Sequence, residues 1–234
     1  MIGEIIDKKL VAQGTLQVTF KVTEPFSFIA GQYCFVTLIN FLYPDDRGGK
    51  RHFSIVNSPN EKGILTIATR LRDSGFKKTL DQLPLGSEVE LGPIAGAFTL
   101  PDDTLKPLVL IAGGIGITPY MSMLRYIKRN KINYKITLVY SNRNRNSTAF
   151  LDELQQLSTQ LPGFKLVLTM TDDPSWTGEK RKVDSTFIRD YFPNVNAQSY
   201  FVVGPPAMVD AVQRSLLEAG VGVENIKIEN FTGY

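Results

Sequence analysis

The first hundred residues alternate short apolar runs with polar, turn-forming segments such as Pro44-Asp45-Asp46. Six runs rich in β-branched and aromatic residues lie at 4–13, 15–22, 32–39, 51–56, 64–71 and 87–92. Strands of this length and spacing predict a six-stranded antiparallel β-barrel of the Greek-key type. Closure of the barrel would leave no sheet edge exposed.

One segment of this half has helical instead of strand periodicity. Residues 73–83 start with residue types that cap helices and stop before Pro84. The apolar residues Phe76, Leu80 and Leu83 recur at a spacing that places them on one helix face. We therefore expect a short helix inside the barrel half.

The pattern changes at about residue 106. Apolar runs at 108–112, 135–140, 164–170, 199–204 and 225–229 alternate with helical patterns near 117–129, 147–161, 184–191 and 205–219. This alternation predicts right-handed βαβ units on a five-stranded parallel sheet. The polar segment 101–107 separates the halves, so we predict a barrel domain at 1–101 and an α/β domain at 102–234.

A glycine-rich turn follows the first strand of the second half. Gly114-x-Gly116-x-x-Pro119 differs only in its last position from the dinucleotide-binding pattern G-x-G-x-x-G/A, and a strand precedes it. Glycines let the backbone approach a ligand closely, and the N-terminus of the next helix attracts phosphate. A strand-to-helix turn without a ligand is the simpler alternative.

Composition limits the class of protein. The net charge of +3 is too small to indicate a nucleic-acid partner, and no run reaches the ~18 apolar residues of a membrane helix. The N-terminus lacks the apolar stretch of a secretory signal. We expect a cytoplasmic monomer. Cys34, the sole cysteine, excludes an internal disulfide and is expected to fill a small buried position.

The string Arg51-His52-Phe53-Ser54 starts a strand of the barrel half. Arginine can clamp a diphosphate, an aromatic ring can cover a planar heterocycle, and a hydroxyl can bond a ring nitrogen. Strand alternation sends Arg51 and Phe53 to one face and Ser54 to the other. His52, the only histidine, is included among the cofactor-contacting residues, with a backbone-only role as the alternative; we predict no metal site.

These motifs, in this order, resemble the ferredoxin-NADP reductase family of flavoproteins. The likeness runs from Gly31 to the C-terminus and covers four motifs: R-x-F-S at 51–54, G-G-x-G-x-T-P at 113–119, G-P-P-x-M at 204–208 and E-x-F at 229–231. The resemblance implies an FAD-binding barrel followed by an NAD(P)-binding α/β domain.

The resemblance assigns the flavin contacts. Arg51 would hold the FAD diphosphate, Phe53 would pack on one flavin face, and Ser54 would bond near flavin N5. A second flavin strand would carry Ala68, Thr69 and Arg70. The helix start that meets the diphosphate would comprise Ser74, Gly75, Phe76 and Lys77, in agreement with the positive charge of a helix N-terminus.

The resemblance also assigns a nicotinamide-nucleotide site. Its expected residues are Gly113, Gly114, Gly116, Thr118, Pro119, Gly204, Pro205 and Met208. The loop after the next strand, where the adenosine ribose lies in such a fold, carries Ser141, Asn142 and Arg143, with Arg145 close behind. It lacks an acidic residue and offers hydroxyl and guanidinium donors, so NADPH is favoured over NADH. A solvated basic loop is the alternative.

At the C-terminus, the resemblance implies that Glu229 relays protons near the flavin and that Phe231 covers the flavin face. Tyr234 is expected to stack on the FAD adenine or to have no contact. Two positions depart from the pattern of many members, with Phe53 replacing a tyrosine and Val203 a cysteine.

We therefore expect an FAD-dependent NAD(P)H oxidoreductase that passes electrons from flavin to a separate acceptor such as ferredoxin, flavodoxin, a haem protein or an oxygenase component. Ser54, Glu229 and Phe231 are its predicted catalytic residues. One alternative is a flavin reductase that uses flavin as a dissociable substrate. Another is a non-catalytic electron-transfer subunit of a larger complex, for which basic residues around 128–135 would supply a docking surface.

Overall fold

The computed structural model describes residues 1–231, which divide into two compact units. Unit 1 comprises Met1–Leu100 together with Thr118–Asn130, and unit 2 comprises Pro101–Ile117 and the chain from Lys131 onward. The helix Thr118–Asn130 thus belongs to the same unit as the first hundred residues, although residues 101–117 separate them along the chain. The sequence carried no signal for this grouping.

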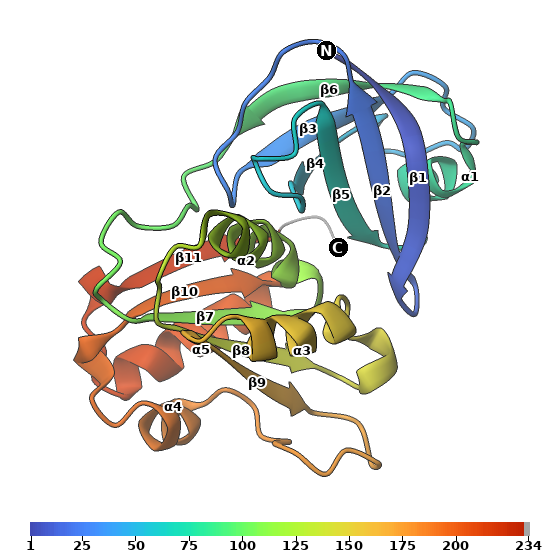
Figure 1. The fold of residues 1–234 in the computed structure, drawn as a ribbon. Coiled ribbons are helices and arrows are strands. Elements are labelled where there is room, and N and C mark those ends of the chain that lie inside the picture. The colour runs from blue at the N-terminus through green and yellow to red at the C-terminus, as the bar shows by residue number, and fades with distance from the viewer. Residues whose placement is uncertain (232–234) are drawn as a thin grey trace. The chain divides into compact units, whose positions relative to one another are not determined.

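Unit 1 contains a six-stranded antiparallel sheet with the order β4-β3-β6-β1-β2-β5 (Figure 1). The bridge between Ile55 and Ile67, and a 2.8 Å hydrogen bond from Val56 N–H to Thr66 O, join the two edge strands and close the sheet into a barrel. The strands are β1 Ile2–Ala12, β2 Thr15–Val22, β3 Tyr33–Leu38, β4 Lys50–Ser54, β5 Ile64–Arg70 and β6 Glu88–Ala95. The predicted barrel is confirmed.

The barrel interior is filled by the alternate residues that the strand pattern predicts. Val18, Phe20 and Ile67 are fully buried in one cluster, to which Phe76 and Leu80 of α1 (Gly75–Gln82) also belong. Cys34 lies in the same cluster, and burial raises the pKa of its thiol to about 12, so it packs as a small apolar residue.

Helix α2 (Thr118–Asn130) is attached to the barrel by side-chain hydrogen bonds to backbone carbonyls. Ser122 Oγ donates to Asn57 O at 2.7 Å, and Arg125 Nη1 donates to Val56 O at 3.0 Å. Both carbonyls belong to the segment that follows β4. The helix therefore fixes the chain just beyond the predicted flavin motif.

Unit 2 is built on a five-stranded parallel sheet with the order β11-β10-β7-β8-β9. Its strands are β7 Leu108–Gly113, β8 Ile136–Asn142, β9 Phe164–Met170, β10 Ser199–Gly204 and β11 Ile226–Asn230. Its helices are α3 Leu151–Gln160, α4 Ser185–Tyr191 and α5 Pro206–Glu218, with short 3-10 turns η1 Gly114–Ile117, η2 Arg145–Ser147, η3 Val195–Ala197 and η4 Val223–Asn225. This confirms the predicted α/β architecture.

Helices cover both faces of this sheet. Val109 and Ile111 of β7 share a buried cluster with Phe187 of α4 and Val209 of α5, which therefore lie on one face. Helix α3 lies on the other face and contacts β9 (Figure 1). Because a parallel sheet covered in this way is buried on both sides, its strands read as continuous apolar runs.

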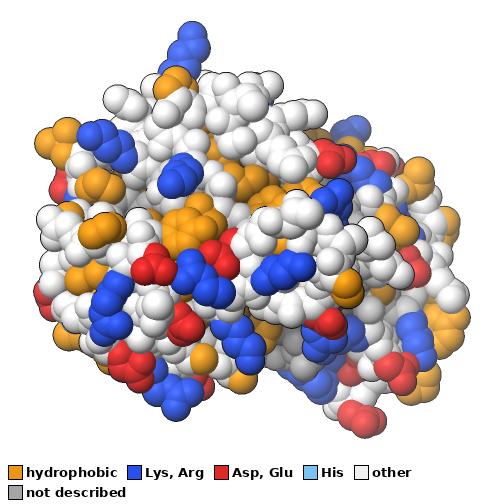
Figure 2. Space-filling view, turned by 90° about the horizontal axis from the view of Figure 1, so that it is seen from below, with side chains coloured by type: hydrophobic (Ala, Val, Ile, Leu, Met, Phe, Trp, Pro, Cys, Tyr) orange, Lys and Arg blue, Asp and Glu red, His pale blue; other side chains and the backbone are white. Residues whose placement is uncertain are grey.

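Charges of both signs are interspersed over the face shown in Figure 2, in line with the net charge of +3. Within residues 1–231, none of the helices is both long and apolar enough to cross a membrane.

Candidate functional site

The N-terminus of α1 forms a cradle that holds an acidic group. Ser74 is the N-cap residue, and its Oγ accepts a hydrogen bond from Lys77 N at 3.3 Å. The carboxylate of Asp45, from the β3–β4 loop, accepts hydrogen bonds from Ser74 Oγ at 2.9 Å and from Phe76 N at 3.0 Å. An anion in this position is stabilised by the free N–H groups and by the helix dipole.

Arg51 forms the other side of the cradle. Its Nη2 donates to Asp45 Oδ1 at 2.5 Å, while Nη1 donates to the carbonyls of Arg47, Gly48 and Lys50 at 2.8 to 2.9 Å. The guanidinium also lies 5.3 Å from the centre of the Phe76 ring. These contacts fix the guanidinium against the start of α1, the position predicted for a diphosphate clamp.

Positive charge is in excess at the cradle. Lys77 is buried, with 6% of its surface exposed, and its pKa is lowered to about 8, first by burial and then by Arg72, Arg51 and Arg47. The pKa of Asp45 lies well below its usual range, chiefly because the Phe76 N–H bonds the ionised form. Three arginines act on Lys77 and one of them, Arg51, pairs with Asp45, so the residues present fit a diphosphate.

The two faces of β4 have different environments. Phe53 lies on the face of Arg51 and packs on Phe76, with ring centres 5.7 Å apart. His52 lies on the opposite face, with its ring 5.3 Å from Tyr33, and burial followed by Arg47 lowers its pKa. The His52 side chain therefore points away from the cradle, which is consistent with the backbone-only alternative.

Ser54 ends β4, is almost fully buried, and pairs with Tyr33 of β3. By strand alternation it shares the face of His52 and not that of Arg51. The structure thus divides the predicted flavin motif between two faces, as the sequence pattern indicated.

The second predicted flavin strand, β5, also presents its residues on two faces. Ala68 pairs with Gln17 and Arg70 pairs with Thr15 on one face, while Thr69 pairs with Leu16 and is buried on the other. Gln17 Oε1 and Thr15 Oγ1 are buried without a hydrogen-bond partner among residues 1–231. Unpaired buried polar atoms are costly, so a polar ligand beside Ala68 and Arg70 would have groups to bond.

In unit 2, the sheet reverses its strand order between β7 and β10. Nucleotides bind outside the carboxyl ends of the strands at such a switch point. β7 ends at Gly113 and β10 at Gly204, and a Cβ added to Gly204 would lie 3.3 Å from Gly113 N. The two glycine motifs quoted from the sequence therefore meet at this point of the fold.

Both motifs need glycine because other atoms approach the backbone closely. A Cβ at Gly113 would lie 2.0 Å from Met208 Sδ, and one at Gly116 would lie 2.5 Å from Val203 O. Gly114 has a φ of 53°, and its carbonyl accepts the Tyr140 hydroxyl at 2.9 Å. Thr118 and Pro119 begin α2, and Pro205 precedes α5.

The end of β8 carries an amide without partners. Asn142 is 6% exposed, and neither its Nδ2 nor its Oδ1 has a hydrogen-bond partner among the described residues. Ser141, one position earlier, pairs with Gly113 of β7. The orphaned amide is thus one residue beyond the position of β8 that pairs with the end of β7. A nucleotide bound at this edge of the sheet would supply both a donor and an acceptor to it.

The segment after β9 supplies an acidic side chain that sequence reasoning missed. Asp172 N donates to Arg143 O at 2.8 Å, and Asp173 Oδ2 accepts from Arg145 N at 3.1 Å. The Arg145 guanidinium lies 5.2 Å from the centre of the Trp176 ring. The predicted basic loop therefore has a carboxylate beside it, which comes from the next strand along the sheet.

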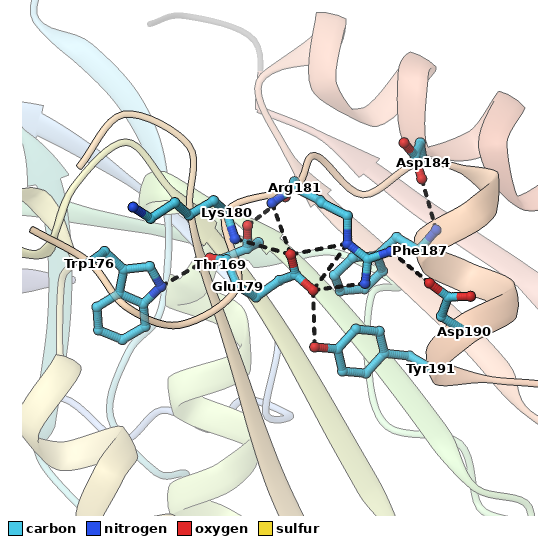
Figure 3. A network of polar contacts seen from close by, with 9 residues as sticks. All are labelled: Thr169, Trp176, Glu179, Lys180, Arg181, Asp184, Phe187, Asp190 and Tyr191. Atoms are coloured by element: carbon cyan, nitrogen blue, oxygen red, sulfur yellow. Dashed lines mark hydrogen bonds and ion pairs between the residues drawn. The ribbon is translucent and has the colours of Figure 1, made fainter. Parts of the chain in front are cut away.

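A polar network holds this segment in place (Figure 3). Glu179 accepts hydrogen bonds from Arg181 and Tyr191, and Arg181 also pairs with Asp190 at 2.6 Å. The Trp176 indole N–H donates to the Glu179 carbonyl at 2.9 Å. The hydrogen bonds from Arg181 lower the pKa of Glu179 to about 2, so this carboxylate is ionised at neutral pH.

The C-terminal signature lies beside the second glycine motif. Glu229 of β11 pairs with Val203, and Phe231 N donates to Gly204 O at 3.0 Å. Glu229 Oε2 is buried without a partner within residues 1–231. Burial raises the pKa of this carboxyl to about 7, against the opposing effect of Lys227. Tyr234 lies outside the described residues.

Comparison with known proteins agrees with this geometry. A family model, the oxidoreductase NAD-binding domain, matches residues 110–214. The chain is 29% identical over 216 residues to the reductase component DmpP of phenol 2-monooxygenase from Pseudomonas sp. strain CF600, covering 90% of this chain and 60% of that protein.

Two solved structures extend the likeness over both units. Cytochrome P450 reductase GcoB from Amycolatopsis is 25% identical with a TM-score of 0.83, covering 99% of this chain and 69% of that one. Phthalate dioxygenase reductase is 25% identical with a TM-score of 0.76, covering 100% of this chain and 69% of that one. The chain is thus similar to ferredoxin-NADP reductase-like reductases. It spans 60%, 66% and 63% of the length of three curated ferredoxin-NADP reductase-like relatives.

Sequence reasoning on this ferredoxin-NADP reductase-like chain overlooked two carboxylates. Asp45 has the sequence context of a turn residue, although it precedes Arg51 by six residues in a loop that returns to the same strand pair. Nothing in the sequence pointed to Asp173, because its contact with Arg145 joins the segments that follow two neighbouring strands, β8 and β9.

Proposed function

We propose that this chain is an FAD-dependent NAD(P)H oxidoreductase that takes hydride from NAD(P)H and passes electrons to a separate acceptor protein. The observation that carries the proposal is the anion cradle of Arg51 and α1 in a barrel, followed in the same chain by a switch-point nucleotide site. Flavin, when bound, converts a two-electron donor into single-electron steps.

In the proposed site, unit 1 holds the flavin nucleotide. Arg51, Lys77 and the N-terminus of α1 bind the diphosphate, because they form a fixed cluster of donors with excess positive charge. Phe53 packs beside the ring system. Ser54, Ala68 and Arg70 provide polar and close backbone contacts, and Thr69, on the opposite face of β5, supports that strand.

Unit 2 holds the nicotinamide nucleotide against Gly113, Gly114 and Gly116 of the first motif and the Gly204 loop. Glu229 is suited to hold or release a proton at its Oε2, since its pKa lies near neutrality. Phe231, anchored to Gly204 through its N–H, closes the site beside it.

A preference for NADPH is the finer part of the proposal. Ser141, Arg143 and Arg145 offer donors to a 2′-phosphate at the β8 carboxyl end. Asp173 opposes the preference, because its carboxylate lies at the Arg145 N–H. Because Asp173 offsets Arg145, we propose Arg143 as the main residue that favours binding of the 2′-phosphate of NADPH.

The acceptor is proposed from the relatives. DmpP is a reductase component of phenol 2-monooxygenase, and phthalate dioxygenase reductase is described as modular for electron transfer from pyridine nucleotides to 2Fe-2S. We propose an oxygenase component, a ferredoxin, a flavodoxin or a haem protein as the acceptor here. A cytoplasmic location and a monomeric state remain predictions.

One observation favours the flavin-reductase alternative, in which flavin dissociates. Asp45 occupies the cradle that the diphosphate would need. Gel filtration of the flavin-loaded protein distinguishes the two functions: retained FAD supports the oxidoreductase, and loss of flavin at micromolar protein supports the alternative.

Anaerobic titration tests the proposed function. FAD-loaded protein is mixed with increasing NADH or NADPH while the flavin absorbance near the visible maximum is recorded. Bleaching at about one equivalent of nucleotide is expected, since hydride carries two electrons. An unchanged spectrum with both nucleotides would reject the proposal.

A further inference from the structure

The carboxylate of Asp45 has the contacts that a phosphate would make in the cradle. It accepts hydrogen bonds from Ser74 Oγ, Phe76 N and Arg47 N, and it pairs with Arg51. Its side chain is 7% exposed and that of Arg51 is 13% exposed, so water screens the pair little. Asp45 is thus bound as an anionic ligand would be.

The loop that carries Asp45 is fastened along α1. The N–H groups of Leu42 and Tyr43 each donate to Thr79 Oγ1 at 3.2 Å, and the Tyr43 hydroxyl donates to Gln82 Oε1 at 2.7 Å. A Cβ on Gly75 would lie 2.0 Å from Pro44 O. The loop therefore lies directly on the first turn of the helix.

The far side of the loop is held by Arg51, whose Nη1 donates to the carbonyls of Arg47 and Gly48 at 2.8 and 2.9 Å. Gly48 N donates a hydrogen bond to Asp45 O at 2.8 Å, which closes a turn, and Gly48 itself has a φ of 69°. Asp46 and Arg47 are exposed at its tip. For Asp45 to move outward, this glycine-containing turn has to rotate and Arg51 has to release the two carbonyls, while Leu42 and Tyr43 can stay bound to α1.

Two anions cannot share the cradle. A diphosphate that approached Arg51 and Phe76 N–H with Asp45 in place would meet a like charge at hydrogen-bond distance, which disfavours both. Binding of the diphosphate therefore requires Asp45 to leave. Because Asp45 then gives up its ion pair and hydrogen bonds in the cradle, the net affinity for the diphosphate falls.

We propose that Asp45 is an internal competitor for the diphosphate of FAD and sets how tightly this chain retains the flavin. The inference rests on the proposed function, because it takes FAD as the ligand of the cradle. The inference makes Asp45 a specificity-determining residue. Asp45 would weaken the binding of flavins that carry a diphosphate and would leave the binding of riboflavin, which has no phosphate, unchanged.

Asp45→Asn tests this competition, since asparagine keeps the shape and removes the charge. Flavin-free wild type, Asp45→Asn and the matched control Asp46→Asn are titrated with FAD and with riboflavin by flavin fluorescence. FAD should bind Asp45→Asn about tenfold or more tightly than wild type, because a charge-assisted competitor is lost. Riboflavin affinity, and all affinities of Asp46→Asn, should be unchanged.

Other outcomes overturn the inference in distinguishable ways. Equal or weaker FAD binding by Asp45→Asn, with wild type still binding FAD, would show that Asp45 does not compete while the proposed function stands. An equal gain in riboflavin affinity for Asp45→Asn would show that the effect of Asp45 does not depend on the diphosphate, contrary to the inference. Absence of FAD binding to all three proteins would reject the proposed function together with the inference.

Thermal unfolding of the flavin-free proteins provides a second readout without flavin. Loss of the Asp45 charge leaves Arg51, Lys77 and Arg47 facing one another, so flavin-free Asp45→Asn should unfold at a lower temperature than Asp46→Asn. Equal unfolding temperatures would show that Asp45 does not neutralise the cradle, contrary to the inference.

Discussion

The two nucleotide sites proposed for this chain differ in whether their charged and polar groups have partners within the protein itself. In unit 1, the cations around α1 are compensated by Asp45, a residue of the chain itself. In unit 2, the Asn142 amide and Glu229 Oε2 are buried without partners among the residues that the structure describes. The cradle of unit 1 thus has a compensating carboxylate from the chain itself, although Thr15 Oγ1 and Gln17 Oε1 beside β5 also lack partners within residues 1–231. The orphaned groups of the unit 2 site have no such compensating partner among the described residues.

This difference predicts opposite responses to ligand and to mutation. A ligand of unit 1 replaces an existing ionic contact, so its affinity is the difference between two similar interactions. A ligand of unit 2 bonds polar atoms that otherwise carry a desolvation penalty. Removing a cation from unit 1 should therefore destabilise the protein with or without ligand. Removing an orphaned group from unit 2 should instead relieve a desolvation penalty in the free protein and weaken nucleotide binding.

Arg51→Ala is expected to have the largest effect. It removes the guanidinium from the cradle and leaves Asp45 without its ionic partner, so FAD affinity should fall about 100-fold and the flavin-free protein should lose stability. Equilibrium dialysis with FAD measures the change, and the exposed neighbour Lys50→Ala is the control. Retention of FAD by Arg51→Ala at wild-type affinity would contradict the role of the cradle.

Glu229→Gln should alter the pH dependence of stability. The folded-state pKa of Glu229 is raised from its ordinary 4.5 to about 7, so its contribution to stability is fully present below pH 4.5 and is lost as pH rises through 7. Wild type should lose about 2 kcal/mol more than the variant between pH 5 and 8, after allowance for partial exposure. Parallel pH profiles from urea unfolding would show that this carboxyl is not perturbed.

Asn142→Leu separates stability from binding. Leucine has a similar size and needs no hydrogen bonds, so the free energy of unfolding should stay the same or rise by about 1 kcal/mol. NAD(P)H affinity should fall about tenfold, because the nucleotide loses a donor and an acceptor. A stability loss with unchanged nucleotide affinity would assign the amide a structural role.

The smallest effect is expected for Arg143→Ala. Arg143 is exposed, so the loss of one contact to a 2′-phosphate should raise the KM for NADPH only about threefold to tenfold. The KM for NADH should not change, because NADH has no phosphate there. An equal loss with both nucleotides would remove the basis for NADPH preference.

The sequence was sufficient for the fold because its signals are local. Apolar alternation predicted the barrel strands, continuous apolar runs predicted β7 to β11, and the spacing of Phe76 and Leu80 predicted α1. The glycine motifs pointed to Gly113 and Gly204 because close backbone approach leaves a trace in residue choice.

Pairings between distant segments left no comparable trace. Asp45 resembles any turn aspartate until the closed loop brings it to Arg51 and Phe76 N–H. The opposed directions of Arg51 and His52 follow from alternation, but the ring contact of His52 with Tyr33 needs the β3–β4 register. Pairing across loops and sheet edges is a tertiary property, and the sequence pattern does not encode it locally.

A crystal structure of the chain with FAD tests the central claim most directly. We expect diphosphate oxygens at Phe76 N–H, Ser74 Oγ and the Arg51 guanidinium, with the Asp45 carboxylate moved out of the cradle. Density for FAD elsewhere on the protein, with Asp45 still bound to Arg51, would contradict the account.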